Sequence, residues 1–159
     1  MSDVQDLYQQ LILDHYRRPR NRRRIEAPDR TAEGANPLCG DEVTIYLKLD
    51  GEIVREVTFE GGGCAISTAS ASLMTEALKG KTLAEAKALF RKFHELLTGR
   101  CGERKFEERG AGPRLGKLAV FSGVCRYPAR VKCATLAWHT LDAALEGTRG
   151  AAPKKVTTE

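Results

Sequence analysis

The stretch EVTIYLKLDGEIVREVTFEGGGCAISTASASLMTEALKG, residues 42–80, changes its hydrophobic period partway along. Its first half alternates apolar and polar residues on both sides of Asp50-Gly51, which predicts two strands joined by a tight hairpin turn. After three glycines the apolar spacing becomes helical and stops at Gly80, which predicts a helix over 64–80. The apolar positions expected on the buried face of the hairpin are Val43, Ile45, Leu47, Leu49, Ile53, Val57 and Phe59.

Helical patterns also flank this stretch. One covers residues 2–16, a second covers 82–99 behind a capping box, and a last helix begins at about 129 or 132 and ends at 146. Residues 1–147 are therefore predicted to form one domain. The segment 100–118 is rich in glycine and charge without periodicity, so we expect a mobile loop, and 148–159 reads as a flexible tail.

Length and composition limit the kind of protein. The chain has 159 residues, of which 42% are hydrophobic, and carries a formal charge of +5, so it can bury a core of its own. No apolar tract is long enough to span a bilayer, and no export leader is visible, which predicts a cytoplasmic protein. Five cysteines in a reducing compartment argue against a disulfide framework and for metal binding, sulfur chemistry or burial.

Three cysteines and one aspartate lie in settings that favour chemistry. Cys39 and Asp41 flank a glycine, and in an extended segment their side chains would point the same way. Cys64 follows three glycines at a predicted helix start, where unpaired N–H groups stabilise a thiolate. Cys133 is expected in the first turn of the last helix, just after two cations. Three thiolates and one carboxylate are four donors, the number that tetrahedral zinc takes.

The alternative for each cysteine is plain packing, because a cysteine in a core helix is often a small apolar filler. We keep that interpretation for Cys125 and regard Cys101 as an exposed, nonessential thiol. The three histidines, His15, His94 and His139, lie within helical patterns and are interpreted as surface or packing residues.

Four separated motifs resemble a known family. LYQQLILDHYRRPRNRR, GANPLCGDEVTIYLKLDG, FEGGGCAISTASASLMTE and GVCRYPARVKCATLAWHTL, in this order, look like the IscU/SufU/NifU N-terminal iron–sulfur cluster assembly proteins. The resemblance implies an α+β fold, a three-stranded antiparallel sheet with helices packed on it, and a site at one end under a glycine-rich loop. It also implies that the metal ligands are Cys39, Asp41, Cys64 and Cys133.

Two departures favour the SufU branch of this family. IscU scaffolds have a histidine directly before the last cysteine, where this chain has Lys132, and they lack the insertion at 100–118. For the SufU branch the resemblance implies a tightly held zinc and sulfur transfer from a SufS-type cysteine desulfurase to downstream iron–sulfur assembly proteins.

The chemistry of the residues suggests a role for each. Zinc with three thiolates and a carboxylate leaves a negative site, so Arg130 and Lys132 are predicted to supply balancing charge. Cys39 lies in a loop and is the ligand best able to leave the metal, so we predict that it accepts the sulfur. Asp41 is a hard oxygen donor among soft sulfurs and should be the weaker anchor.

Two other functions fit parts of the sequence. The same ligands suit a scaffold that assembles a [2Fe–2S] cluster, with iron in place of zinc. The run RRPRNRRR, residues 17–24, and the basic pI suggest a zinc-stabilised nucleic-acid-binding module, although no aromatic residues interleave the arginines. We therefore expect no nucleic-acid partner and no membrane partner.

Overall fold

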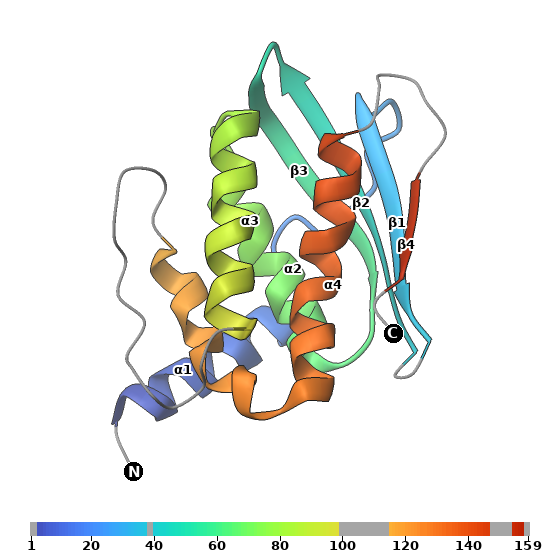
Figure 1. Cartoon of the computed structure of the whole chain (residues 1–159). Coiled ribbons are helices and arrows are strands. Elements are labelled where there is room, and N and C mark those ends of the chain that lie inside the picture. The colour runs from blue at the N-terminus through green and yellow to red at the C-terminus, as the bar shows by residue number, and fades with distance from the viewer. Residues whose placement is uncertain (1–2, 38–39, 99–114, 147–153, 158–159) are drawn as a thin grey trace.

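The computed structural model of the chain describes residues 3–37, 40–98, 115–146 and 154–157 (Figure 1). Within these residues, no helix combines the length and the hydropathy that crossing a bilayer requires. The elements in chain order are α1 (Asp3–Arg17), β1 (Arg30–Asn36), β2 (Asp41–Asp50), β3 (Ile53–Gly62), α2 (Ala65–Leu78), α3 (Leu83–Thr98), the 3-10 helix η1 (Gly116–Arg126), α4 (Pro128–Leu145) and β4 (Lys154–Thr157).

The predicted α+β fold is confirmed. Strands β1, β2 and β3 form an antiparallel sheet, and α2 and α4 pack on it, with α3 beside α4 (Figure 1). Helix α4 lies close to β1 at Gly34, where an added Cβ would come within 2.0 Å of Thr140 Oγ1. Only a residue without a side chain permits this approach. Because α4 is held against the sheet, the residues in its first turns lie at a fixed place relative to the sheet end.

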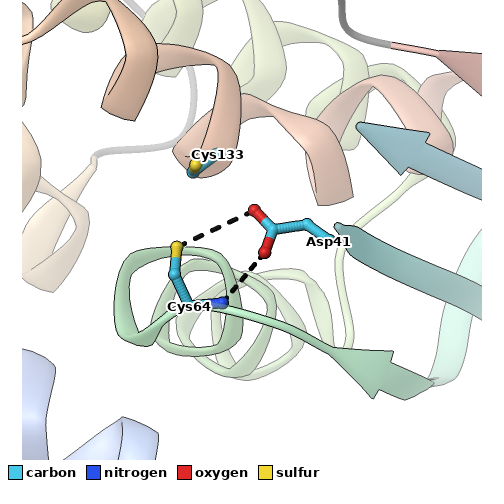
Figure 2. A group of neighbouring side chains, drawn as sticks. All are labelled: Asp41, Cys64 and Cys133. Atoms are coloured by element: carbon cyan, nitrogen blue, oxygen red, sulfur yellow. Dashed lines mark hydrogen bonds between the residues drawn. The ribbon is translucent and has the colours of Figure 1, made fainter. Parts of the chain in front are cut away.

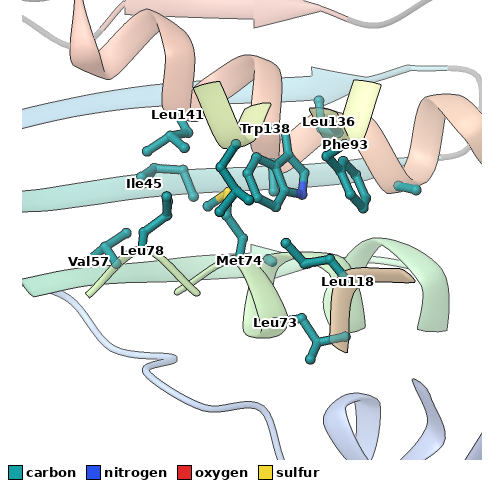
Figure 3. Packing of buried hydrophobic residues seen from close by; sticks show 14 of the residues in the cluster. Ile45, Val57, Leu73, Met74, Leu78, Phe93, Leu118, Leu136, Trp138 and Leu141 are labelled. Atoms are coloured by element: carbon teal, nitrogen blue, oxygen red, sulfur yellow. The ribbon is translucent and has the colours of Figure 1, made fainter. Parts of the chain in front are cut away.

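The core lies between the sheet and the helices (Figure 3). The Trp138 and Phe93 rings stack with centroids 4.6 Å apart, and Phe121 meets Phe93 edge to face at 5.7 Å. The Trp138 Nε1–H donates to Ser70 Oγ over 3.2 Å, and Ser70 in turn donates to the Ala134 carbonyl, so the buried polar atoms are matched. These contacts fasten α2 to α4 beside the candidate site.

Most of the residues predicted to begin or end helices do so in the structure. The capping box is formed, with Thr82 N–H donating to Glu85 Oε1 over 3.2 Å and Glu85 N–H donating to Thr82 Oγ1 over 3.1 Å. Helix α4 begins at Pro128, which is favourable at the first helical position because its missing N–H would have no partner there. Cys133 is therefore in the second turn of α4, and its predicted place in the first turn is wrong.

The buried face of the hairpin departs from strict alternation at one position. Val54 is fully buried, whereas Ile53 is 45% exposed, so the prediction that Ile53 faces the core is wrong. The register shifts between Lys48 and Leu49, because Lys48 pairs with Glu56 and Leu49 with Val54. This bulge inserts one residue into β3 and reverses which side chains face inward beyond it.

Two segments predicted to be irregular contain regular structure. Lys154–Thr157 form β4, which pairs in parallel with β1 and adds a fourth strand to the sheet, so the prediction of a flexible tail is wrong for these residues. In the segment 100–118, Leu115 and Leu118 are buried, and η1 begins at Gly116. Burial of two leucines stabilises this end of the segment. Its residues up to 114 lie outside the described residues.

Candidate metal centre

The end of β3 and the start of α2 place Cys64. Cys64 is the N-cap of α2, and its Sγ accepts the Ser67 N–H over 3.4 Å, as expected for a helix start whose first N–H groups have no partner in the helix. Three glycines lead into this turn. Gly61 has φ +86°, a conformation that side chains disfavour, and a Cβ on Gly63 would come within 1.8 Å of Asp41 Oδ1. Because residues 61–63 are glycines, the backbone that leads into α2 can approach the Asp41 carboxylate closely.

Asp41 is the first residue of β2 and is fully buried. Its Oδ1 accepts the Cys64 backbone N–H over 2.9 Å, and its Oδ2 lies 3.7 Å from Cys64 Sγ (Figure 2). The Cys64 N–H has no partner within α2, and the Asp41 carboxylate provides the acceptor that it needs. The partial positive charge at the start of the helix in turn favours a carboxylate at this place. This contact fixes Asp41 next to a thiol that follows it by more than twenty residues in sequence.

Cys133 approaches the same point from α4. It is 2% exposed, and its Sγ donates to the Ala129 carbonyl over 3.5 Å. The ligand atoms of Asp41, Cys64 and Cys133 all lie within 4.8 Å of one another. Figure 2 shows the three side chains gathered at one place. We call these three residues the cysteine cluster. Two sulfurs and a carboxylate oxygen at this separation are a donor set that can hold a soft or borderline metal ion.

Arg130 supplies positive charge beside the cluster. The negative charge on Cys64 and a hydrogen bond to Cys133 raise the pKa of Arg130, which lies one turn before Cys133 in α4. Arg130 is exposed, so it can balance the thiolates from the solvent side without being buried itself. Lys132 is half-buried and directly precedes Cys133. Its role in charge support stays a prediction.

The fourth predicted ligand, Cys39, lies outside the described residues. Its neighbour Gly40 has φ +71°, so the backbone is not extended at Gly40. The Gly40 N–H donates to the Asn36 carbonyl over 2.9 Å and closes a turn between β1 and β2. The structure therefore brings together three of the four predicted ligands and does not test the fourth.

Among the described residues, none of the three histidines belongs to the cysteine cluster. Cys101 is outside the described residues, and Cys125 falls in η1. His15 is buried between α1 and α2, in agreement with a packing role, and its Nδ1 lies 2.7 Å from Ser72 Oγ. His94 and His139 face one another between α3 and α4, with ring centroids 5.6 Å apart. Spacing along the chain gave no sign of this pairing.

The arginine run connects α1 to the rest of the molecule. Arg20 pairs with Asp14 over 2.7 Å, and Arg23 pairs with Glu56 of β3 over 2.6 Å. Between them Asn21 adopts φ +58° and donates through Nδ2 to Thr75 of α2 over 3.0 Å. Two of the six arginines thus have acidic partners within the protein.

The chain is an α+β protein that brings two cysteines and one aspartate together, as a candidate metal centre, at the meeting point of a strand, a helix N-terminus and a second helix. Comparison with known proteins gives the family. A model of the NifU-like N terminal domain matches residues 7–134. The chain belongs to this family, which includes the IscU and SufU proteins, and its role lies in iron–sulfur cluster assembly.

Relatives of two kinds are similar to the chain. The zinc-dependent sulfurtransferase SufU of Bacillus subtilis (strain 168) is 39% identical over 141 residues, which cover 89% of this chain and 90% of that protein. The iron–sulfur cluster assembly scaffold protein IscU of Streptococcus pyogenes serotype M1 is 36% identical over 146 residues, which cover 92% of this chain and 87% of the relative. The two sequence identities differ by too little to distinguish a sulfurtransferase from a scaffold protein.

Solved structures support the fold. The crystal structure of a SufU from the thermophile Fervidobacterium islandicum AW-1, named as an iron–sulfur cluster assembly scaffold protein for the SUF system, has a TM-score of 0.77 and 39% identity, and the match covers 86% of this chain and 95% of that chain. A NifU-like N-terminal structure from Brucella abortus has a TM-score of 0.75 and 26% identity, covering 91% and 95% respectively.

Proposed function

We propose that this protein is a zinc-dependent sulfur acceptor that takes persulfide sulfur from a SufS-type cysteine desulfurase. The observation that carries the proposal is the cysteine cluster, whose three donor atoms lie within 4.8 Å of one another beside the Arg130 guanidinium. The similarity to the zinc-dependent sulfurtransferase of Bacillus subtilis supports zinc as the metal. Lys132, where IscU scaffolds have a histidine, supports the same branch.

In this proposal Cys39 completes the metal site with Asp41, Cys64 and Cys133. Bound zinc supplies Lewis acidity that keeps the thiols ionised, and it has no redox chemistry of its own. Asp41 and Cys64 are held to one another through the Cys64 N–H, so they form the fixed part of the site. Arg130 and Lys132 offset the negative charge of the thiolates.

Sulfur transfer then proceeds by exchange. The Cys39 thiolate attacks the outer sulfur of the persulfide on the desulfurase, and a new S–S bond forms at Cys39. The bond between the two desulfurase sulfurs breaks, and the desulfurase cysteine leaves as a thiolate. The oxidation state of the transferred sulfur is unchanged, so no oxidant or reductant is consumed. The Cys39 persulfide passes its sulfur to downstream iron–sulfur assembly proteins.

A Cys39→Ala variant tests this assignment. It should retain much of its zinc, still associate with the desulfurase, and fail to raise sulfide release from cysteine, whereas the wild type raises it. Mass spectrometry of the wild type should find one added sulfur on the peptide that contains Cys39. If the variant stimulates the desulfurase as well as the wild type does, or if the added sulfur is on Cys101 or Cys125, the acceptor is another residue.

A scaffold for [2Fe–2S] assembly is the second candidate, because the Streptococcus pyogenes relative is named as a scaffold and is 36% identical over nearly the whole chain. Cysteine ligation serves iron–sulfur clusters as well as zinc. Elemental analysis of protein purified without added metal separates the two. One zinc per chain and no acid-labile sulfide supports the acceptor, and iron with equimolar sulfide supports the scaffold.

A further inference from the structure

Two of the three histidines meet at a second place in the molecule. His94 of α3 and His139 of α4 have ring centroids 5.6 Å apart at an interplanar angle of 79°. Phe90 contacts both rings edge to face, with centroids 5.9 Å from His94 and 5.3 Å from His139. All three side chains are half-buried. The pair is therefore held by packing and still has access to solvent.

The separation suits a shared metal ion. Two imidazoles on one tetrahedral ion, with metal–nitrogen bonds of about 2 Å, have ring centres roughly 5 Å apart. The observed 5.6 Å is reached with a small side-chain adjustment. His139 also lies six residues after Cys133, about 9 Å along the helix axis, so this pair belongs to a different site from the cysteine cluster.

Thr98 offers a hydrogen-bond partner to one ring nitrogen of His94. The Thr98 hydroxyl donates its hydrogen to the His94 carbonyl over 2.7 Å. Thr98 Oγ1 can then only accept from His94 Nδ1, which lies 3.4 Å away. A proton on His94 Nδ1 would leave Nε2 with the lone pair that a metal ion requires. Metal-binding histidines commonly use their other ring nitrogen in this way.

The charges around His139 favour a cation. Burial lowers the pKa of His139, and the neighbouring His94 lowers it further, so the ring is neutral at pH 7 and able to bind a metal ion. Asp142 lies one turn further along α4 and acts on His139 in the opposite direction, which places a negative charge close to the ring. Imidazole nitrogens are ligands for divalent zinc, nickel or copper, and the nearby Asp142 carboxylate adds a favourable field for a cation.

We propose that His94 and His139 form a second metal site that binds one divalent transition-metal ion between α3 and α4. Among the described residues, the cysteine cluster is the only group of three or more such donors, so water completes the coordination of an ion held by this pair. The ion links two helices that are adjacent in the fold. It therefore binds the folded chain in preference to the unfolded chain, and this preference raises the free energy of unfolding. This site is independent of the proposed sulfur transfer.

The test uses the untagged full chain and Zn²⁺. Histidine ring nitrogens are followed by ¹H–¹⁵N NMR, which separates the two tautomers and reports coordination directly. Before zinc is added beyond one equivalent, His94 should be in the Nδ1–H form. Further zinc should shift the ring nitrogens of His94 and His139 saturably and together. His15 is the internal control, because it is 1% exposed and both of its ring nitrogens already have partners.

Variants identify the ligands. His94→Gln and His139→Gln should each weaken the second zinc by about tenfold or more, and Asp142→Asn should weaken it less. Glu95→Gln, which changes an exposed carboxylate next to His94 in sequence, should leave the affinity unchanged. The proposal is overturned if zinc leaves the His94 and His139 signals in place, or if either glutamine variant binds the second ion as tightly as the wild type.

Discussion

Helix α2 contributes buried polar groups to two regions of the molecule. The two regions differ in the partners that these polar groups have. In the middle of α2, Ser72 and Thr75 belong to a network whose donors and acceptors all come from the protein, and we call it the serine network. At the N-terminus of α2, Cys64 meets Asp41 and Cys133, three groups that all become negative when they ionise. A matched network holds the fold together, whereas converging groups of one sign need a cation from outside.

The serine network can be followed atom by atom. The Arg20 N–H donates to Ser72 Oγ over 2.8 Å, and Ser72 Oγ lies 2.7 Å from His15 Nδ1. His15 Nε2 lies 3.4 Å from Glu76 Oε1, so both ring nitrogens of His15 have a partner within the protein. Thr75 adds contacts to the Ser72 carbonyl over 2.7 Å and to Asn21. This network needs no ligand to be stable.

The largest expected effect comes from removing a ligand of the cysteine cluster. Cys64→Ser or Cys133→Ser should abolish zinc binding, because the remaining donors are left as unbalanced charges. A metal present at a thousand times its dissociation constant stabilises the native state by about 4 kcal/mol, so the melting temperature should fall by roughly 10 °C. Elemental analysis and thermal unfolding measure both effects. Full zinc occupancy in both variants would contradict the ligand assignment, and Cys101→Ser and Cys125→Ser serve as controls.

A smaller effect is expected from Gly63→Ala. The new Cβ would lie 1.8 Å from Asp41 Oδ1, so the carboxylate must move away from Cys64. Zinc affinity should fall by about 10- to 100-fold, the loss seen when groups that position a ligand are displaced. Competition with a chromophoric chelator measures it. The matched control is Gly123→Ala, where nothing lies within 4 Å of an added Cβ, and zinc affinity should be unchanged. Equal affinities in the two variants would show that the Asp41 position is unimportant.

The serine network should respond in the opposite way. Ser72→Ala leaves His15 Nδ1 and the Arg20 N–H without their partner, which costs about 1–3 kcal/mol for buried groups. Chemical denaturation should show this loss, while zinc content stays at the wild-type value. A variant that loses zinc along with stability would show that the two regions of α2 are coupled and would end the distinction drawn between them.

The smallest expected effect is a pH dependence of stability. Burial lowers the pKa of His15, so below about pH 6.5 the unfolded chain takes up a proton that the folded chain does not. The free energy of unfolding should therefore fall as the pH drops below that value, by at most about 1.4 kcal/mol per pH unit for this group. His15→Gln should remove this share of the slope. Burial also lowers the pKa of His139, which contributes to the slope that remains, and an unchanged slope would exclude His15 as a source.

Local patterns determined most of the elements. Alternation identified the inward residues of β2, the capping box fixed the start of α3, and the glycine run identified Cys64 as the start of α2. These signals depend on neighbours within a few residues, so they can be interpreted without a fold. The motifs also carried the family resemblance and, with it, the ligands Asp41, Cys64 and Cys133.

Tertiary structure decided the features that depend on distant residues. Val54 replaces Ile53 in the core because a bulge shifts the pairing of β3 with β2, and Lys154–Thr157 become a strand because β1 presents an edge for them. His94 and His139 meet only because α3 packs beside α4. The sequence by itself determined which residues could bind a metal, since that is a property of each side chain. Which of them share a site was decided by packing, because a donor set is a matter of a few ångströms between residues far apart in the chain.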